Sequence, residues 1–261
     1  MDEFRRFRLN GRVAMVAGAS GGIGLRACEA LAAVGANVVA VGRARERLVD
    51  AERAVAAAGS EALAVVGDMG SKTDADRAVD EAIGRFGRLD ILVNSIGGGA
   101  GTALYPAEDY PESEWDRIVD LNLRTTLLPS QAAVRAMIAA GNGGRILNLS
   151  SVRGQLGIDA GYSAYVAAKG ALNALTRQHA TEWAKHGITV NAISPTFVRT
   201  KQTESLLADE AFYERIVARI PLRRIADPDD LVGAILYFCS DASAFVSGQV
   251  LTLDGGLTAT Q

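Results

Sequence analysis

The sequence has few residues of the kinds that hold metals or form disulfide bonds. In 261 residues its only cysteines are Cys28 and Cys239, and its only histidines are His179 and His186. Both cysteines fall in apolar stretches of helical character, so they do not form the disulfide framework of a small secreted domain. With so few histidines, we expect no metal site built on histidine.

Long apolar runs and a strong charge of either sign are also missing. No uncharged stretch is long enough for a membrane-spanning helix. Residues 1–8 are charged and have no apolar core, so they do not resemble a secretory signal. The net charge of −3 gives no reason to expect nucleic acid or an anionic membrane as a partner. We therefore expect a cytoplasmic protein.

The chain also lacks a linker rich in proline and serine, an internal repeat and a low-complexity tract. We therefore expect residues 1–261 to form a single domain. Short apolar runs rich in β-branched residues alternate with longer helical runs. This pattern is typical of an α/β protein with a doubly wound parallel sheet, because strands buried on both faces read as continuous apolar runs.

The expected strands are residues 13–17, 37–41, 62–66, 91–94, 145–149, 189–193 and 250–253. The expected helices are residues 23–33, 45–58, 72–86, 115–140, 163–185 and 228–240. Residues 197–220 depart from the alternation. They follow a strand, carry charges and end at Pro221, so we expect a small helical insertion over the site there.

A glycine-rich turn follows the first expected strand directly. It contains Gly18, Ser20, Gly22, Ile23 and Gly24. Glycines permit a tight turn and close approach of the backbone, and the helix that starts near residue 23 offers free N–H groups and a positive dipole to a pyrophosphate. The spacing is G-x-x-x-G-x-G, not the G-x-G-x-x-G of longer-chain dehydrogenases. Its place in a βαβ unit favours phosphate binding over an ordinary glycine-rich turn.

Arg43 follows the end of the second strand, where a site for NAD usually has an acidic residue that holds the ribose hydroxyls. Arg43, helped by Arg45, could pair with a 2′-phosphate, although a solvated basic start to a helix is the alternative. We therefore expect NADP(H) as the preferred cofactor and NAD(H) as the second choice. Asp68, with Met69 beside it, is placed to accept a hydrogen bond from an adenine amino group. A plain cap of the strand end explains Asp68 nearly as well.

Tyr165 and Lys169 fall four residues apart in a run rich in alanine and leucine, which predicts a helix. Residues at this spacing share a face, so the phenol and the ammonium lie side by side. A neighbouring cation favours phenolate, which would make the pair an acid/base closer to neutrality. Taken alone, such a pair is more often a solvated helix face.

Together these residues resemble the short-chain dehydrogenase/reductases along nearly the whole chain. The matching pieces are residues 18–24, Asp68, Asn94 with Gly97, Asn122, 148–151, Tyr165 with Lys169, 191–195 and 254–256. The resemblance implies a Rossmann-type fold of about seven parallel strands, a nicotinamide cofactor, and oxidoreductase activity on a small carbonyl or alcohol substrate. It also implies a homotetramer, with the helices at 115–140 and 163–185 at subunit contacts.

The same resemblance implies a catalytic set and a cofactor-binding set. The catalytic set is Asn122, Ser151, Tyr165 and Lys169, and the cofactor set adds Asn94, Gly97, Pro195, Val198 and Thr200. Tyr165 exchanges the proton and Ser151 hydrogen-bonds the carbonyl. Lys169 lowers the pKa of Tyr165 and holds the ribose hydroxyls, while Asn122 holds a water that relays protons. Ser150 competes for the serine role, and local helix hydrogen bonding is the alternative for Asn122.

The chain departs from the family pattern at three places. Ala17-Gly18 stands where Thr-Gly is usual, which removes a hydroxyl that often ties the turn to a neighbouring strand. Asn94-Ser95-Ile96-Gly97 replaces Asn-Ala-Gly, and Pro195-Thr196 replaces Pro-Gly. None removes a catalytic group. We expect the longer glycine-rich loop at 97–101 to be pliable and to shape the pocket.

The pocket is expected to be lined by residues 97–103, 152–160 and 197–207. Its polar side chains are Arg153, Gln155, Arg199, Lys201 and Gln202, although each could be a solvated loop residue. They suit a polar, carboxylated substrate, and the C-terminal half resembles sugar-acid and polyol dehydrogenases of the gluconate 5-dehydrogenase type. We therefore expect a carbonyl reductase for a keto-sugar acid. The alternatives are a 3-oxoacyl-thioester reductase and, more remotely, a nucleotide-sensing protein without catalysis.

Overall fold

The computed structural model describes residues 3–99 and 101–260 and confirms the doubly wound parallel α/β fold. Within these residues, seven strands form one sheet in the order β3-β2-β1-β4-β5-β6-β7, and every neighbouring pair is parallel. The strands are β1 (Val13–Ala17), β2 (Asn37–Gly42), β3 (Ala62–Val66), β4 (Ile91–Asn94), β5 (Gly144–Leu149), β6 (Ile188–Pro195) and β7 (Val250–Leu253). The order reverses between β1 and β4, and parallel sheets bind ligands at such a switch point, beyond the carboxyl ends of the strands.

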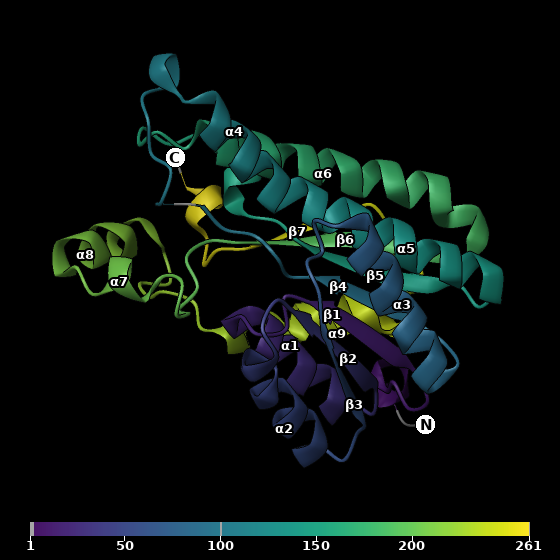
Figure 1. Ribbon diagram of the computed structural model, residues 1–261. Helices are drawn as coiled ribbons and strands as arrows, with labels where there is room; N and C mark the ends of the chain where they lie inside the picture. The colour runs from purple at the N-terminus through teal and green to yellow at the C-terminus, as the bar shows by residue number, and fades with distance from the viewer. Residues whose placement is uncertain (1–2, 100, 261) are drawn as a thin grey trace.

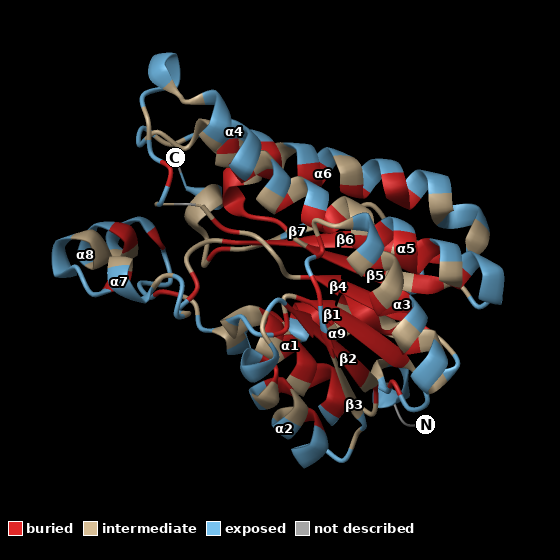
Figure 2. Ribbon diagram, in the orientation of Figure 1, coloured by how far each residue is buried: buried red, intermediate tan, exposed pale blue. Residues whose placement is uncertain are grey.

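Helices cover both faces of the sheet (Figure 1). One face carries α1 (Gly22–Ala33), α2 (Val49–Ala57) and α9 (Val232–Cys239), and the other carries α3 (Lys72–Phe86), α5 (Thr125–Ala140) and α6 (Ser163–Trp183). Successive strand residues point to opposite faces, so β1 contributes Ala14 and Val16 to the first core and Val13 and Met15 to the second. The central strands are buried throughout (Figure 2), which explains their uninterrupted apolar sequences.

The single helix expected at 115–140 is two helices in the structure. α4 (Glu112–Val119) and α5 are joined by one π-helical turn at Asp120–Arg124. A π turn adds one residue and leaves the apolar spacing almost unchanged, so the sequence pattern does not reveal it. Asn122 lies in this turn and is fully buried. The expected helices at 45–58 and 228–240 begin with 3₁₀ turns, at Arg45–Arg47 and Pro228–Leu231.

The insertion expected at 197–220 contains two short helices, α7 (Glu204–Leu207) and α8 (Glu210–Arg219). Figure 1 shows them standing apart from the helices that cover the sheet. They have a small apolar cluster of their own, which includes Leu207, Ile216 and Ile220 and packs against Phe197 at the end of β6. The insertion is therefore anchored where β6 leaves the sheet.

Within the described residues, no helix combines the length and the apolar character needed to cross a membrane. The same part of the chain contains no group of three or more His, Cys, Asp or Glu side chains that could hold a metal ion. Cys28 and Cys239 are buried free thiols, and burial raises the pKa of each to about 12.

Candidate active site

The glycine-rich turn after β1 is packed so closely at Gly18 and Gly24 that neither position has room for a side chain. A Cβ on Gly24 would lie 2.1 Å from the carbonyl oxygen of Gly18, and Gly18 has a φ of +91°, which favours glycine. α1 begins at Gly22, and its N-cap Gly21 supplies no side-chain hydrogen bond. The first N–H groups of α1 are therefore not capped by a side chain, which is the arrangement that binds phosphate at helix starts.

Backbone hydrogen bonds hold this turn where the family's usual threonine hydroxyl is missing. The N–H groups of Gly18 and Ala19 donate to the carbonyl oxygen of Val41 at 2.9 and 3.0 Å, which ties the turn to β2. Thr200 lies against the turn from the loop after β6, because a Cβ on Gly22 would be 2.9 Å from the Thr200 Cγ2. The structure thus brings Thr200 to the glycine-rich turn.

Arg43 and Arg45 differ in what they contact. Arg45 forms a two-point ion pair with Glu52, at 2.7 and 3.0 Å, so its guanidinium is already engaged. Arg43 is exposed, and it makes no hydrogen bond or ion pair with any residue that the structure describes. Ser20 approaches the same strand end, since a Cβ on Gly42 would lie 3.3 Å from the Ser20 Oγ. The help expected from Arg45 is therefore not supported, whereas Arg43 is available beside the turn.

Asp68 and Met69 follow β3 and face different ways. Asp68 is exposed, and its Oδ1 accepts a hydrogen bond from the Gly70 N–H at 2.9 Å, which is the local cap weighed as its alternative role. The Met69 side chain is only 1% exposed and belongs to the core, so only its backbone is left to meet a cofactor.

Asn94 ends β4 at the switch point of the sheet. Its Nδ2 donates to Ser130 Oγ and to Asn148 Oδ1, both at 2.9 Å. Its Oδ1 is buried and has no partner among the described residues. A buried polar atom without a partner costs free energy, so the position is one where a bound group can complete the hydrogen bonding.

The two serines after β5 have separate partners, which decides between them. Ser150 Oγ donates to Asn173 Oδ1 at 2.6 Å and is buried in that contact. Ser151 Oγ instead accepts a hydrogen bond from the Arg153 N–H at 3.2 Å, and it lies close enough to Tyr165 to lower the pKa of its phenol. Ser151 is therefore the serine that reaches Tyr165, and Ser150 secures the strand end to α6.

Tyr165 and Lys169 share one face of α6, as the spacing predicts. The Lys169 Nζ lies 5.7 Å from the centroid of the Tyr165 ring and donates to the carbonyl oxygen of Leu149 at 2.9 Å. Burial lowers the pKa of Lys169 to about 8. Burial also raises the pKa of Tyr165, against the opposing effects of the Ser151 hydrogen bond and the Arg153 charge. The net depression of the Tyr165 pKa that the resemblance implies is therefore not what the structure shows, because desolvation of the phenolate outweighs the nearby positive charge.

Asn122 is brought to this pair by the glycine loop after β4. Its Nδ2 donates to the carbonyl oxygens of Gly98 and Ile118 at 2.8 and 2.9 Å, and its Oδ1 accepts from the Gly98 N–H at 3.1 Å. A Cβ on Gly97 would lie 2.9 Å from the Asn122 Oδ1 and 3.0 Å from the Lys169 Nζ. The bond to the Ile118 carbonyl oxygen is the local helix hydrogen bond that was weighed as the alternative role of Asn122. The side chains of Asn122 and Lys169 nevertheless both lie against Gly97.

The loop after β6 holds the remaining predicted residues. Pro195 and Val198 are buried where β6 ends, and Val198 forms a short parallel bridge with Ala226. Gln202 reaches the glycine loop, since a Cβ on Gly98 would be 2.3 Å from its Nε2. A cleft of about 460 Å³ lies along this segment, and it is lined by Arg199, Thr200, Lys201, Glu204, Leu207 and Ala208.

The polar residues expected at the substrate pocket fall into two groups. Gln155 donates to Thr252 Oγ1 at 3.1 Å, and Arg199 lies 3.6 Å from Asp227 Oδ1, so both contact residues outside the predicted catalytic set. Lys201 is exposed. Arg153, by contrast, is 6% exposed and lies close enough to Tyr165 to act on its pKa.

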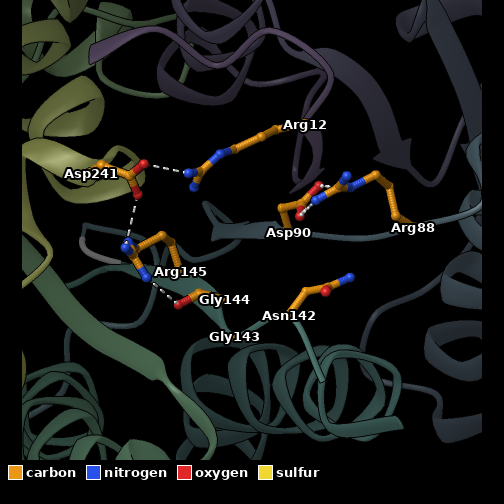
Figure 3. Close-up of a pocket in the computed structure, with 8 residues that line it drawn as sticks. All are labelled: Arg12, Arg88, Asp90, Asn142, Gly143, Gly144, Arg145 and Asp241. Atoms are coloured by element: carbon orange, nitrogen blue, oxygen red, sulfur yellow. Dashed lines mark hydrogen bonds and ion pairs between the residues drawn. The ribbon is translucent and has the colours of Figure 1, made fainter. Parts of the chain in front are cut away.

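A second cavity, of about 130 Å³, lies at the amino ends of β1 and β5, and none of the residues predicted to be catalytic lines it. Figure 3 shows that its charged side chains pair with one another: Asp241 accepts from both Arg12 and Arg145, and Asp90 accepts from Nε and Nη2 of Arg88. Asp90 also accepts from the Val13 N–H at 2.9 Å, so β1, β4 and β5 are tied together where they enter the sheet. We attribute this cavity to structure rather than catalysis.

Four residues near the site were not singled out from the sequence. Asn173 lies one helical turn beyond Lys169 and Tyr162 one turn before Tyr165, so helical spacing could have found both. Ser130, which contacts Asn94, and Arg219, whose charge acts on Arg153, come from distant segments and carry no local signal.

Comparison with known proteins places the chain among oxidoreductases. Residues 18–258 match the family described as enoyl-(acyl carrier protein) reductase. An uncharacterized oxidoreductase of Mycobacterium tuberculosis is 40% identical over 258 residues, which cover 97% of this chain and 94% of that protein. Gluconate 5-dehydrogenase of Gluconobacter oxydans is 40% identical over 255 residues, which cover 97% and 96%.

A solved structure gives the same result. The gluconate 5-dehydrogenase of Burkholderia cenocepacia, crystallised with NADP and tartrate, is 35% identical to this chain, with a TM-score of 0.91. The match covers 98% of each chain.

Proposed function

Because the chain belongs to the short-chain dehydrogenase/reductase family, a family of oxidoreductases, we propose that it interconverts a keto-sugar acid and its alcohol with NADP(H). The observation that carries the reaction is the meeting of Ser151, Tyr165 and Lys169 beside the switch point of the sheet. The substrate class is supported by the gluconate 5-dehydrogenase relatives, which match nearly the full length of the chain. 5-Ketogluconate is the best single candidate.

The residues fit a dinucleotide. The closely packed turn at 18–24 and the uncapped start of α1 suit its pyrophosphate, and Arg43 with Ser20 suits a 2′-phosphate. Asp68 would hold the adenine end, with the Met69 backbone beside it. Asn94, Gly97, Pro195, Val198 and Thr200 would line the nicotinamide half. When bound, the nicotinamide supplies or accepts the hydride.

The protein's own part is to position the carbonyl and move the proton. Ser151 donates a hydrogen bond to the carbonyl oxygen, and Tyr165 donates its proton to the alkoxide that forms. Because burial raises the pKa of Tyr165, its phenol is protonated at neutral pH and ready to donate. Lys169 holds the ribose hydroxyls and returns a proton to Tyr165, and Asn122 keeps the adjoining loop and a relaying water in place.

We further propose that residues 1–261 act as one unit, with 197–220 as a loop that closes over the substrate. Its contacts support this, because Thr200 lies against Gly22 while Gln202 lies against Gly98. We propose a cytoplasmic homotetramer that uses α4, α5 and α6 as contact surfaces. Trp115 and Ile138 on these helices are large apolar residues that remain 39% exposed.

The proposal is tested by following NADPH and NADH consumption with ketogluconates, 3-oxoacyl thioesters and simple diketones. We expect NADPH-dependent turnover of a ketogluconate, and a fall of at least about 1000-fold in kcat for Tyr165→Phe with cofactor binding retained. Turnover of 3-oxoacyl thioesters alone would support the alternative named from the sequence. Unchanged turnover by Tyr165→Phe would exclude the mechanism.

A further inference from the structure

Arg153 is a buried cation held rigidly beside the catalytic residues. It lies in the 3₁₀ turn Val152–Gly154, and the Oγ of the N-cap residue Ser151 accepts a hydrogen bond from the Arg153 N–H at 3.2 Å. The same short turn therefore sets both the catalytic serine and the guanidinium. The Arg153 charge acts on the pKa of both Tyr162 and Tyr165, so it reaches the surface that Tyr165 presents to a substrate.

The charge of Arg153 is not balanced within the described part of the chain. Only 6% of the residue is exposed, and its single side-chain hydrogen bond runs from Nη1 to the carbonyl oxygen of Gly157 at 3.2 Å. No carboxylate among the described residues pairs with it. A guanidinium has five N–H donors, and buried charges in proteins are almost always paired. An unpaired buried arginine next to an active site therefore indicates a place for an anion.

A second cation increases the imbalance. Arg219, at the end of α8, acts on Arg153 and lowers its pKa further, after the larger effect of burial. Arg219 is itself exposed and forms no ion pair with a described residue. The turn after β5 and the insertion thus bring two like charges within electrostatic reach of each other. Such an arrangement is unfavourable until a negative charge lies between them.

We propose that Arg153 binds the carboxylate of the substrate and thereby sets which carbonyl group faces Ser151 and Tyr165. This inference rests on the proposed function, because it takes the substrate to be an acid, and it adds the residue that recognises the acid. Arg219 contributes a weaker attraction from the insertion. Arg43, at the other end of the site, would serve the cofactor and not the substrate.

The physical reason for selectivity lies in the burial of the guanidinium. A planar carboxylate can accept two parallel hydrogen bonds from arginine, which fixes its orientation as well as its position. A neutral sugar in the same pocket leaves the buried charge without an anion. A site built around a charged partner rejects an analogue that lacks it more strongly than an apolar pocket rejects a missing methylene. We therefore expect an acid to be preferred over a neutral ketose of equal size.

The test compares 5-ketogluconate with the neutral ketose L-sorbose in the wild type, Arg153→Gln and Arg153→Lys. We expect Arg153→Gln to lower kcat/KM for the acid by about 100-fold or more, mainly through KM, and to change the neutral ketose by less than about 3-fold. Arg153→Lys should restore part of the loss, because it keeps the charge without the two-point geometry. An equal loss for both substrates would overturn the proposal. Arg53→Gln removes an exposed charge on α2, where the nearest carboxylate is 4.0 Å away, and serves as the control.

Two further measurements separate this proposal from the proposed function and from a purely structural role. Thermal shifts of the NADP⁺-saturated protein with gluconate, tartrate and 3-hydroxybutyrate report acid binding without turnover. Stabilisation by an acid that Arg153→Gln loses would support the anchor even if no ketogluconate is reduced, whereas no stabilisation by any acid would overturn it. With a neutral alcohol, removing the charge of Arg153 should move the ascending limb of the pH–rate profile for oxidation to higher pH, since that charge lowers the Tyr165 pKa. An unmoved limb would show that Arg153 does not act on Tyr165.

Discussion

The Lys169 Nζ lies 5.7 Å from the centroid of the Tyr165 ring, and burial disfavours the charged form of both groups. It lowers the pKa of Lys169 to about 8 and raises the pKa of Tyr165. Lys169 therefore remains mostly an ammonium at pH 7 and becomes a neutral amine above about pH 8, whereas Tyr165 stays a neutral phenol. A proton passing between substrate and Tyr165 then moves beside two positive charges, those of Lys169 and Arg153.

Lys169→Met should change how stability depends on pH. A lysine with a depressed folded-state pKa binds fewer protons when folded than when unfolded. The buried charge therefore lowers the free energy of unfolding by its full amount below about pH 8, and this loss disappears as the pH rises toward the unfolded pKa of 10.5. The wild type should gain stability relative to Lys169→Met between pH 8 and 10.5, with a slope of up to about 1.4 kcal/mol per pH unit. Urea unfolding at several pH values measures this. A difference that stays constant with pH would contradict the buried ammonium.

Arg43→Asp should weaken NADP(H) binding by at least about 10-fold and leave NAD(H) much less affected, because it removes the exposed cation beside Ser20 and adds a carboxylate. Arg45→Asp is the matched control, since Arg45 is paired with Glu52 and its loss should change both affinities by similar, small factors. Quenching of protein fluorescence by each nucleotide gives the constants. Equal loss of NADP(H) and NAD(H) in Arg43→Asp would remove the 2′-phosphate assignment.

Gly24→Ala should weaken cofactor binding about 10-fold or more, because the new Cβ would lie 2.1 Å from the Gly18 carbonyl oxygen and must displace the phosphate turn. Gly84→Ala in α3 is the control, since nothing lies within 4 Å of its Cβ position. Alanine there should stabilise the helix by about 0.5–1 kcal/mol. Nucleotide titration and thermal unfolding of both variants make the comparison. Unchanged affinity in Gly24→Ala would mean that the turn does not hold the pyrophosphate.

Ser151→Ala and Ser150→Ala should separate activity from stability. Ser151→Ala is expected to lower kcat about 100-fold or more, because it removes the hydroxyl that hydrogen-bonds Tyr165. Ser150→Ala should keep most activity and lose about 1–3 kcal/mol of stability, since it leaves the buried Asn173 Oδ1 without its 2.6 Å partner. Steady-state rates and urea unfolding test both. The reverse pattern would exchange the two roles.

The local features of this protein could be predicted from its sequence. The seven apolar runs of the sequence correspond to the seven strands of the sheet that the structure describes, because parallel strands covered on both faces must be apolar throughout. The turn at 18–24 and the placing of Tyr165 and Lys169 on one face of α6 follow from glycine geometry and helical periodicity, which extend over only a few residues. These features need no knowledge of distant parts of the chain.

Other features depend on segments that are remote in sequence, so only the tertiary structure decided them. Ser150 is engaged by Asn173, 23 residues further along the chain, which no spacing rule reveals. The direction of the Tyr165 pKa shift depends on burial produced by the whole fold, and that burial outweighs the neighbouring charge. In the sequence, nothing distinguishes Arg153 from other loop arginines. In the structure it is buried near Tyr165, and the charge of Arg219 from α8 acts on it. The burial of a residue and the electrostatic effect of distant charges both depend on all the neighbours that pack around it. Only the tertiary structure therefore determines the chemical properties of this site.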